Sequence, residues 1–317
     1  MDKSQKNPDI FIKKMISEIR EDRDHGASYL SQRAVEALKF AALRSRLKNK
    51  KAFLDELKSL ATELTRVRPS MVPLTNSIGS IIYLLCEEEK KGVDISELKN
   101  FIAAKADQFI KHSREAINTI GKHAAELIGY QNTIMTYSWS STVIEAIKQA
   151  KSKDIRVIVS ESRPLNEGEK TAEKISSQGI PITFITDAQN GYFIKESDLV
   201  LIGADSILSC GSVINKMGTY LLALAAKEAK VPLYILGETA KIDIRSAQSS
   251  QIKLEEKEAG EISAHNAANI KVRNIYFDIT PFQLITGVIT EAGIIKPNQI
   301  IQYARAVGKK RKIFEAD

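Results

Sequence analysis

The apolar residues of this chain recur every three or four positions from residue 8 to about residue 128. That spacing predicts amphipathic helices. Two prolines in Arg68-Pro-Ser-Met-Val-Pro73 interrupt the series, because a continuous helix does not tolerate both. The predicted helical stretches contain Ile10–Ile19, Ala34–Leu43, Asn49–Arg66, Ser77–Glu88 and Ile95–Glu126.

After residue 130 the pattern changes to short β-branched runs that alternate with helical segments, which is typical of βαβ units and a mostly parallel sheet. The runs are nearly uniformly apolar, as expected of strands covered on both faces. The predicted strands are Thr133–Thr136, Ile155–Val159, Ile182–Ile185, Leu199–Ile202, Leu233–Leu236 and Ile275–Ile279. The predicted helices are Thr142–Ser152, Glu167–Ser177, Tyr220–Lys230 and Pro281–Ala292. We therefore expect an α/β protein with a helical N-terminal domain over 1–128 and a Rossmann-like sheet domain over 129–317.

Composition narrows the class of protein. The 317 residues are 43% hydrophobic and 27% charged, which is ordinary for a globular protein, and the formal charge of +7 suggests phosphates, RNA or an acidic protein as partners. Two cysteines argue against a disulfide framework and favour a reducing compartment. The polar N-terminus and the lack of a long apolar run predict a cytoplasmic protein with no membrane segment. Neither CxxC nor HExxH occurs, so no metal site is expected.

The segment Gly203–Thr219 follows a predicted strand and precedes a predicted helix. It carries Asp205, Asn215 and Lys216 between glycines. Open α/β sheets bind ligands at the carboxyl ends of their strands, so these side chains are candidate ligand groups. The alternative is an ordinary strand-to-helix connection with a polar surface. Since neither GxGxxG nor GxxxxGK[ST] is present, no dinucleotide cofactor is expected.

Other polar residues fall at the same predicted edge. Ser138 and Ser140 follow one strand, Arg163 follows another, and Lys241 follows a third. A basic, hydroxyl-rich edge with the single carboxylate Asp205 would suit a sugar phosphate. These residues could equally be the polar ends of the strands.

Two stretches of the helical part could also receive an anion. In His25-Gly-Ala-Ser28, Ser28 could cap a helix whose first backbone amides bind phosphate. Arg68 stands beside Pro69, as Arg163 stands beside Pro164, on a stiff loop suited to bidentate recognition. A structural ion pair would explain each arginine equally well.

The chain resembles the superfamily of the alpha, beta and delta regulatory subunits of eukaryotic translation initiation factor two B, which includes ribose-1,5-bisphosphate isomerase and methylthioribose-1-phosphate isomerase. The resemblance covers nearly the whole chain. The matching motifs are Gly26-Ala-Ser28, Arg68-Pro-Ser-Met-Val72, Ser162-Arg-Pro-Leu-Asn-Glu-Gly168, Thr186-Asp-Ala188, Gly203-Ala-Asp205, Asn215-Lys-Met-Gly-Thr219, Glu238-Thr-Ala-Lys241, Tyr276-Phe-Asp-Ile-Thr-Pro281 and Ile289-Thr-Glu-Ala-Gly293.

The resemblance implies a helical domain followed by a Rossmann-like domain, assembled as a homodimer or hexamer. The isomerases use a cysteine and an aspartate to move a proton as an aldose becomes a ketose. Asp205 matches the aspartate, whereas Ser138 occupies the cysteine position between Tyr137 and Trp139, where the isomerases have histidines. A thiol, with an ordinary pKa of about 8.5, can be tuned to exchange protons near neutrality, whereas a serine hydroxyl is too weak an acid without a neighbouring base.

The ligand-binding set of the superfamily is largely retained, although His25 replaces an arginine. By resemblance it comprises His25, Gly26, Ala27, Ser28, Arg68, Ser140, Arg163, Asn215, Lys216 and Lys241. Three hypotheses follow. The first is a regulatory subunit that binds a sugar phosphate or nucleotide without turning it over, with translation initiation factor 2 as its partner. The second is a ribose-1,5-bisphosphate isomerase that uses Asp205, and the third is a structural paralogue with an empty pocket.

Overall fold

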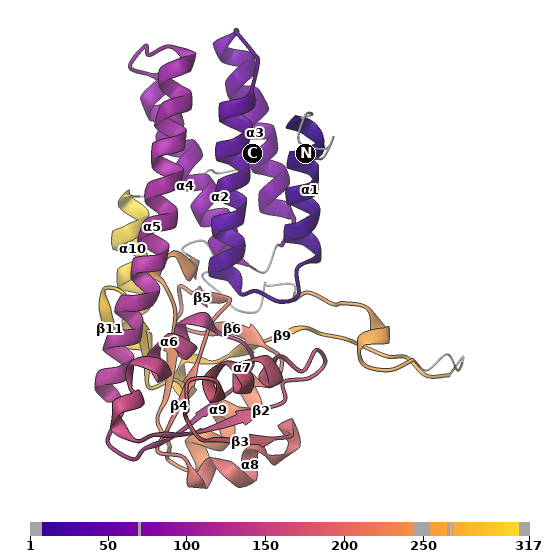
Figure 1. The fold of residues 1–317 in the computed structure, drawn as a ribbon, viewed down its shortest axis with the longest axis vertical. Helices are drawn as coiled ribbons and strands as arrows, with labels where there is room; N and C mark the ends of the chain where they lie inside the picture. The colour runs from indigo at the N-terminus through magenta and orange to yellow at the C-terminus, as the bar shows by residue number, and fades with distance from the viewer. Residues whose placement is uncertain (1–7, 69–70, 244–253, 265–266, 268, 311–317) are drawn as a thin grey trace. The chain divides into compact units, whose positions relative to one another are not determined.

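In the computed structural model the described residues are 8–68, 71–243, 254–264, 267 and 269–310. The chain divides into two compact units, residues 1–115 with 306–317, and residues 116–305 (Figure 1). The division falls within the long helix α5, Ile95–Leu127. The domain boundary predicted at 128–129 coincides with the end of that helix and remains a prediction.

The first unit is helical, as its apolar spacing predicted. It contains α1 (Pro8–Glu21), α2 (Ala27–Arg44), α3 (Lys50–Arg66), α4 (Val72–Glu89) and the first part of α5. Helix α2 packs against α1, α3 and α4 and buries Leu30, Ala34 and Leu38 completely or nearly so. Helix α3 begins where the Asn49 side chain accepts a hydrogen bond from the Ala52 amide (3.0 Å), which satisfies one of the free donors of its first turn.

The predicted capping role of Ser28 is wrong. Gly26 is the N-cap of α2, with no side-chain capping bond, and Ser28 lies inside the first turn with its side chain buried. The helix therefore begins two residues earlier than a Ser28 cap requires.

The second unit is built on a seven-stranded sheet with the order β11-β10-β7-β4-β1-β2-β3. All neighbouring pairs are parallel except β10 and β11. This confirms the predicted α/β class with a mostly parallel sheet. The strands are β1 (Thr133–Thr136), β2 (Arg156–Ser160), β3 (Ile182–Ile185), β4 (Leu199–Ile202), β7 (Leu233–Leu236), β10 (Gly287–Thr290) and β11 (Gly293–Ile295).

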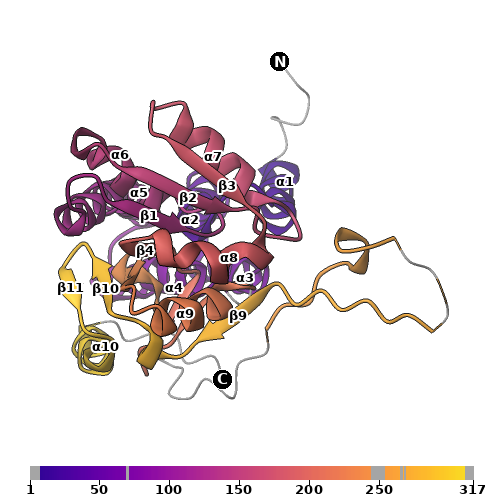
Figure 2. The same cartoon turned by 90° about the horizontal axis from the view of Figure 1, so that it is seen from below.

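Helices cover both faces of this sheet (Figure 2). Successive strand residues pack on opposite sides. On one face, Ile134 and Val157 pack with the end of α5, with α6 (Ser141–Gln149) and with α7 (Glu167–Ser176). On the other, Met135 and Ile158 join the cluster formed by α8 (Asn190–Phe193), α9 (Thr219–Glu228) and the start of α10 (Ile300–Lys310). Burial on both faces explains the uniformly apolar strands.

The helix predicted over Pro281–Ala292 is wrong. The structure has a 3-10 turn at Phe282–Leu284 and then β10, an interior strand between β7 and the edge strand β11. Apolar pairs at 284–285 and 288–289 imitate helical spacing, and spacing alone cannot distinguish a buried strand from a buried helix. The β-branched residues of this stretch instead pair with β7 and β11.

A second, four-stranded sheet with the order β8-β5-β6-β9 lies beside the first within this unit. Its strands are β5 (Ser206–Leu208), β6 (Val213–Lys216), β8 (Ile242–Asp243) and β9 (Phe277–Thr280). The segment Gly203–Thr219, expected to be a loop, therefore contains the antiparallel pair β5–β6. The described residues between 254 and 276 form an extended arm, drawn in orange in Figure 1, with one bridge between Glu256 and Ile275.

Candidate functional site

The chain turns sharply after β1. Ser138 adopts a left-handed conformation (φ 63°) and is buried. Its amide donates to Ser162 Oγ (2.7 Å), and its carbonyl accepts from Thr171 Oγ1 (2.9 Å). Ser140 then caps α6 by accepting from the Val143 amide (3.3 Å). These bonds fix the Ser138 side chain at the carboxyl edge of the sheet.

Ser138 belongs to a chain of three interacting side chains. Its hydroxyl donates to Glu167 Oε2, and Lys216 Nζ lies 2.9 Å from Glu167 Oε1. The side chains of Lys216 and Glu167 are only 6% and 14% exposed. Lys216 Nζ also lies 3.6 Å from the centre of the Tyr276 ring, a cation–π contact. Three elements, the β1 turn, the start of α7 and the end of β6, therefore bring opposite charges together in a site sheltered from solvent.

Asp205 follows β4 and belongs to the same charged region. Burial raises its pKa from 3.8 to about 6, although the positive charges of Lys241 and Lys216 oppose the rise. The negative charges of Glu167 and Glu255 act in the same direction as burial. A carboxyl group with this pKa can both donate and accept a proton near neutral pH.

The remaining predicted residues of this edge have structural partners. Lys241 is buried, and its ammonium donates to the Ala204 carbonyl (2.7 Å). Asn215 is buried, and its amide donates to Thr219 Oγ1 (3.0 Å) at the start of α9. The exposed Arg163 donates from its guanidinium to the carbonyl of Ile262 in the arm (3.2 Å). These residues and Ser138 all lie in the second unit, and their role as a ligand site stays a prediction.

Tyr137 was noted only as a departure from the isomerase pattern, yet it lies at the centre of a second buried cluster. Its hydroxyl donates to the Met217 carbonyl (2.6 Å) and lies 3.5 Å from Asp187 Oδ2. Burial, followed by the negative charges of Asp187 and Asp278, raises the pKa of Tyr137, so its hydroxyl stays protonated. Tyr137 thus packs against the β6–α9 connection and bonds its backbone at Met217.

Asp278 and Gly218 shape that connection. Asp278 Oδ2 accepts from the amides of Gly218 (2.7 Å) and Tyr220 (3.0 Å), and burial raises the Asp278 pKa to about 6. Gly218 has φ 109°, and a Cβ there would lie 2.3 Å from the Tyr137 hydroxyl. The glycine is required both by its backbone conformation and by the close approach of Tyr137.

Glu167, Tyr137, Asp187 and Asp278 were missed as candidate residues of this edge. Glu167 opens a helix, where an acidic residue is common because it complements the helix dipole. The signal that could have found it is its place in Ser162-Arg-Pro-Leu-Asn-Glu-Gly168, directly after a strand end.

The other predicted ligand residues, His25, Gly26, Ala27, Ser28 and Arg68, lie in the helical unit. His25 Nδ1 lies 2.8 Å from Asp22 Oδ2, and its ring stacks on Tyr29. Arg68 is 4% exposed, and its guanidinium donates to the carbonyls of Ile19 (3.1 Å) and Asp22. The structure thus gives Arg68 a role that was not considered, as a brace for the C-terminal end of α1.

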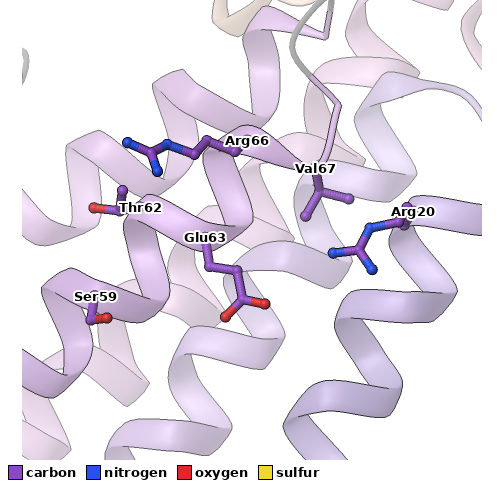
Figure 3. Close-up of a pocket in the computed structure, with 6 residues that line it drawn as sticks. All are labelled: Arg20, Ser59, Thr62, Glu63, Arg66 and Val67. Carbon is purple, nitrogen blue, oxygen red and sulfur yellow. The ribbon is translucent and has the colours of Figure 1, made fainter.

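A surface cavity of about 410 Å³ also lies in the helical unit, between α1 and α3 (Figure 3). It is lined by Arg20, Ser59, Thr62, Glu63, Arg66 and Val67. None of the predicted ligand residues lines it. Within the described ranges, no three His, Cys, Asp or Glu residues are placed to hold a metal ion. Among the helices of those ranges, none has the length and apolar character needed to cross a membrane.

Comparison with known proteins identifies the family. A family model described as the Initiation factor 2 subunit family matches residues 23–297. The chain belongs to this family. Its members include a ribose 1,5-bisphosphate isomerase of Methanocaldococcus jannaschii, which is 35% identical over 90% of this chain and 92% of its own length.

Other relatives are named as initiation-factor-like proteins rather than isomerases. A Pyrococcus horikoshii protein named as translation initiation factor eIF-2B subunit 2-like is 33% identical over 92% of this chain and 98% of its own length. A crystal structure described as the translation initiation factor eIF-2B of P. horikoshii superposes with a TM-score of 0.79 at 32% identity, covering 92% of this chain and 99% of that one. The family resemblance is confirmed, and the family contains both isomerases and initiation-factor-like proteins.

Proposed function

We propose that the carboxyl edge of the sheet binds a phosphorylated ribose-type sugar or a nucleotide, and that the chain serves as an initiation factor 2B-like regulatory subunit. The observation that carries this proposal is the presence of two buried ammonium groups, Lys216 and Lys241, near the carboxylate of Asp205. An anionic ligand would add to the compensation that Glu167 and Asp205 already give these buried cations, and so reduce the cost of keeping them from water. A sugar phosphate offers both a phosphate for the lysines and hydroxyls for Asp205.

The serine at position 138 supports a protein that binds its ligand but does not convert it by thiol chemistry. The isomerase cysteine is replaced, and the two cysteines of the chain lie elsewhere, Cys86 in α4 and Cys210 in the β5–β6 connection. As a regulatory subunit the chain would assemble as a homodimer or hexamer and contact translation initiation factor 2. A solved structure of the tetrameric eIF2B beta–delta complex shares this fold.

Calorimetry tests the proposed pocket. Ribose 1,5-bisphosphate and AMP are titrated separately into the full chain and into Lys216→Ala and Arg163→Ala. We expect at least one ligand to bind the wild type, and each substitution to weaken it at least tenfold, as loss of a charged phosphate contact does. Lys227→Ala, at an exposed position of α9, is the control. Equal affinities in all four proteins would contradict the placement of the pocket.

A second candidate function is aldose–ketose isomerisation of ribose 1,5-bisphosphate, with Asp205 as the acid. The observation that favours it is the place of Asp205 among Glu167, Lys216 and Lys241, where its pKa of about 6 leaves a minor fraction of the carboxyl protonated near neutrality. Wild-type turnover that disappears in Asp205→Asn would make the chain an enzyme. A wild type that binds the sugar phosphate without converting it would support the regulatory subunit.

A further inference from the structure

Glu167 is a carboxylate of this site that the binding proposal above does not use to contact the ligand. Its Oε2 accepts from the Ser138 hydroxyl, and its Oε1 lies 2.9 Å from Lys216 Nζ. Ser138 occupies the position of the isomerase cysteine, so Glu167 lies one hydrogen bond from where the thiol would be. The Glu167 side chain is 14% exposed, so it is not wholly shielded from solvent.

A carboxylate can act as the base that the isomerisation needs and that Ser138 does not supply. Isomerisation requires a base that removes a carbon-bound proton next to a carbonyl or incipient carbonyl carbon, and a serine hydroxyl alone cannot do this near neutrality. A glutamate performs that task in triosephosphate isomerase, another aldose–ketose isomerase. Glu167 is therefore a base of suitable type, held beside the residue that replaced the thiol.

We propose that Glu167 is the base that exchanges the carbon-bound proton of a bound sugar phosphate in this chain, with Ser138 and Lys216 as positioning residues. The inference rests on the sugar-phosphate binding proposed above and supplies the isomerase candidate with its missing group. Ser138 and Lys216 each engage one carboxylate oxygen and fix the plane of the carboxylate. The Lys216 ammonium is itself held against the Tyr276 ring.

The protons balance in the resulting reaction. Asp205 gives its proton to the ring oxygen of ribose 1,5-bisphosphate as the bond from C1 to that oxygen breaks. Glu167 takes the proton from C2, and the electron pair of the C2–H bond forms a C1=C2 double bond. The 2-hydroxyl then returns a proton to Asp205 as C2 becomes a carbonyl, and Glu167 delivers its proton to C1. Both carboxyl groups return to their starting states, and no oxidant or reductant is needed.

The test follows hydrogen exchange in D₂O. The full chain is incubated with ribose 1,5-bisphosphate, and proton NMR records the loss of the C2–H signal and the formation of the ketose. We expect exchange by the wild type and a loss of at least 100-fold in Glu167→Gln, which keeps the shape of the side chain and removes the base. Glu169→Gln, two residues along α7 and exposed, is the matched control and should exchange at the wild-type rate.

Calorimetry on the same proteins separates the possible failures. Glu167→Gln should bind the sugar phosphate within a fewfold of the wild type, and Glu167→Asp, which keeps the charge, should retain partial exchange. Ser138→Ala should slow exchange about tenfold without abolishing it, because the base remains. A wild type that binds without exchange, or a Glu167→Gln variant that exchanges normally, would overturn this inference and leave the binding proposal intact. A wild type that does not bind the sugar phosphate would overturn both.

Discussion

At the scale of the residue, Ser138 distinguishes the two candidate functions. It has the buried position and the left-handed turn that direct its side chain to the carboxyl edge, but it carries a hydroxyl where a thiol is expected. Its hydroxyl donates a hydrogen bond to Glu167. Ser138 therefore keeps the geometry of this position, but its hydroxyl is a much weaker acid than a thiol.

Restoring the thiol is the first test at this scale. If the missing thiol is the only defect, Ser138→Cys should convert ribose 1,5-bisphosphate at least tenfold faster than the wild type, because a thiol ionises far more readily than a hydroxyl. A coupled assay for the ketose measures the rate. Cys210→Ser in the same background checks that the new thiol is responsible. No gain would mean that Tyr137 or Trp139 has also changed the site.

Asp205 makes stability depend on pH. Burial raises its pKa in the folded chain from 3.8 to about 6, so the folded state binds this proton more tightly than the unfolded state. The resulting stabilisation is fully present below pH 4 and is lost as the pH rises through 6. Asp205→Asn should therefore raise the free energy of unfolding at pH 8 by about 1–3 kcal/mol relative to its effect at pH 4. Urea unfolding at both pH values measures this, and an equal effect at the two values would contradict it.

At the scale of the element, helix ends depend on single residues from distant parts of the chain. Arg68 bonds two carbonyls near the end of α1, although 46 residues separate it from Asp22. The carbonyls of a last turn have no partner within their own helix, so a buried guanidinium that binds them joins α1 to the residues that follow α3.

Arg68→Ala should consequently reduce stability. We expect a loss of about 2–4 kcal/mol, because buried carbonyls lose a charged donor. Arg66→Ala, at the exposed end of α3, should change stability by about 0.5 kcal/mol or less. Thermal unfolding of both variants measures the difference. If Arg68→Ala keeps its stability and instead loses affinity for the sugar phosphate, Arg68 is a ligand residue, as first predicted from its place beside proline.

The turn between β6 and α9 depends on Gly218. We expect Gly218→Ala to destabilise the protein by about 2–4 kcal/mol, because alanine is strained at φ 109° and its Cβ would collide with Tyr137. Gly191→Ala in α8 is the control, since a Cβ there meets nothing within 4 Å. Denaturant unfolding compares the two. Similar stabilities would show that Tyr137 can move away at little cost.

At the scale of the whole molecule, local spacing was sufficient to predict the helical unit and the alternation of strands and helices. It failed where tertiary pairing decides the structure. The stretch that becomes β10 has helical spacing, and only its place between β7 and β11 makes it a strand. The pair β5–β6 was missed because its strands of three and four residues lie between glycines.

The candidate site was predictable to the extent that strand ends meet at one edge. Asp205 and Ser138 were proposed because they follow predicted strands, whereas Lys216 was proposed from the glycine-containing segment Gly203–Thr219 and lies in β6, which was not predicted. Glu167 was missed because its interaction with Ser138 spans 29 residues and its interaction with Lys216 spans 49, and no local pattern indicates such pairs. The ligand role of Arg68, suggested by its sequence context, stays a prediction, while in the structure its side chain bonds the backbone of α1.

The contact between Lys216 and the Tyr276 ring has a consequence for synthesis on the ribosome. Chains emerge from the N-terminus first, so Ser138, Glu167 and Lys216 are all available before Tyr276 has been made. Until then, the ammonium lacks the ring that covers it in the finished protein. We therefore expect a nascent chain that ends before residue 276 to leave this lysine open to water and to other anions, and the last part of the arm to complete the site.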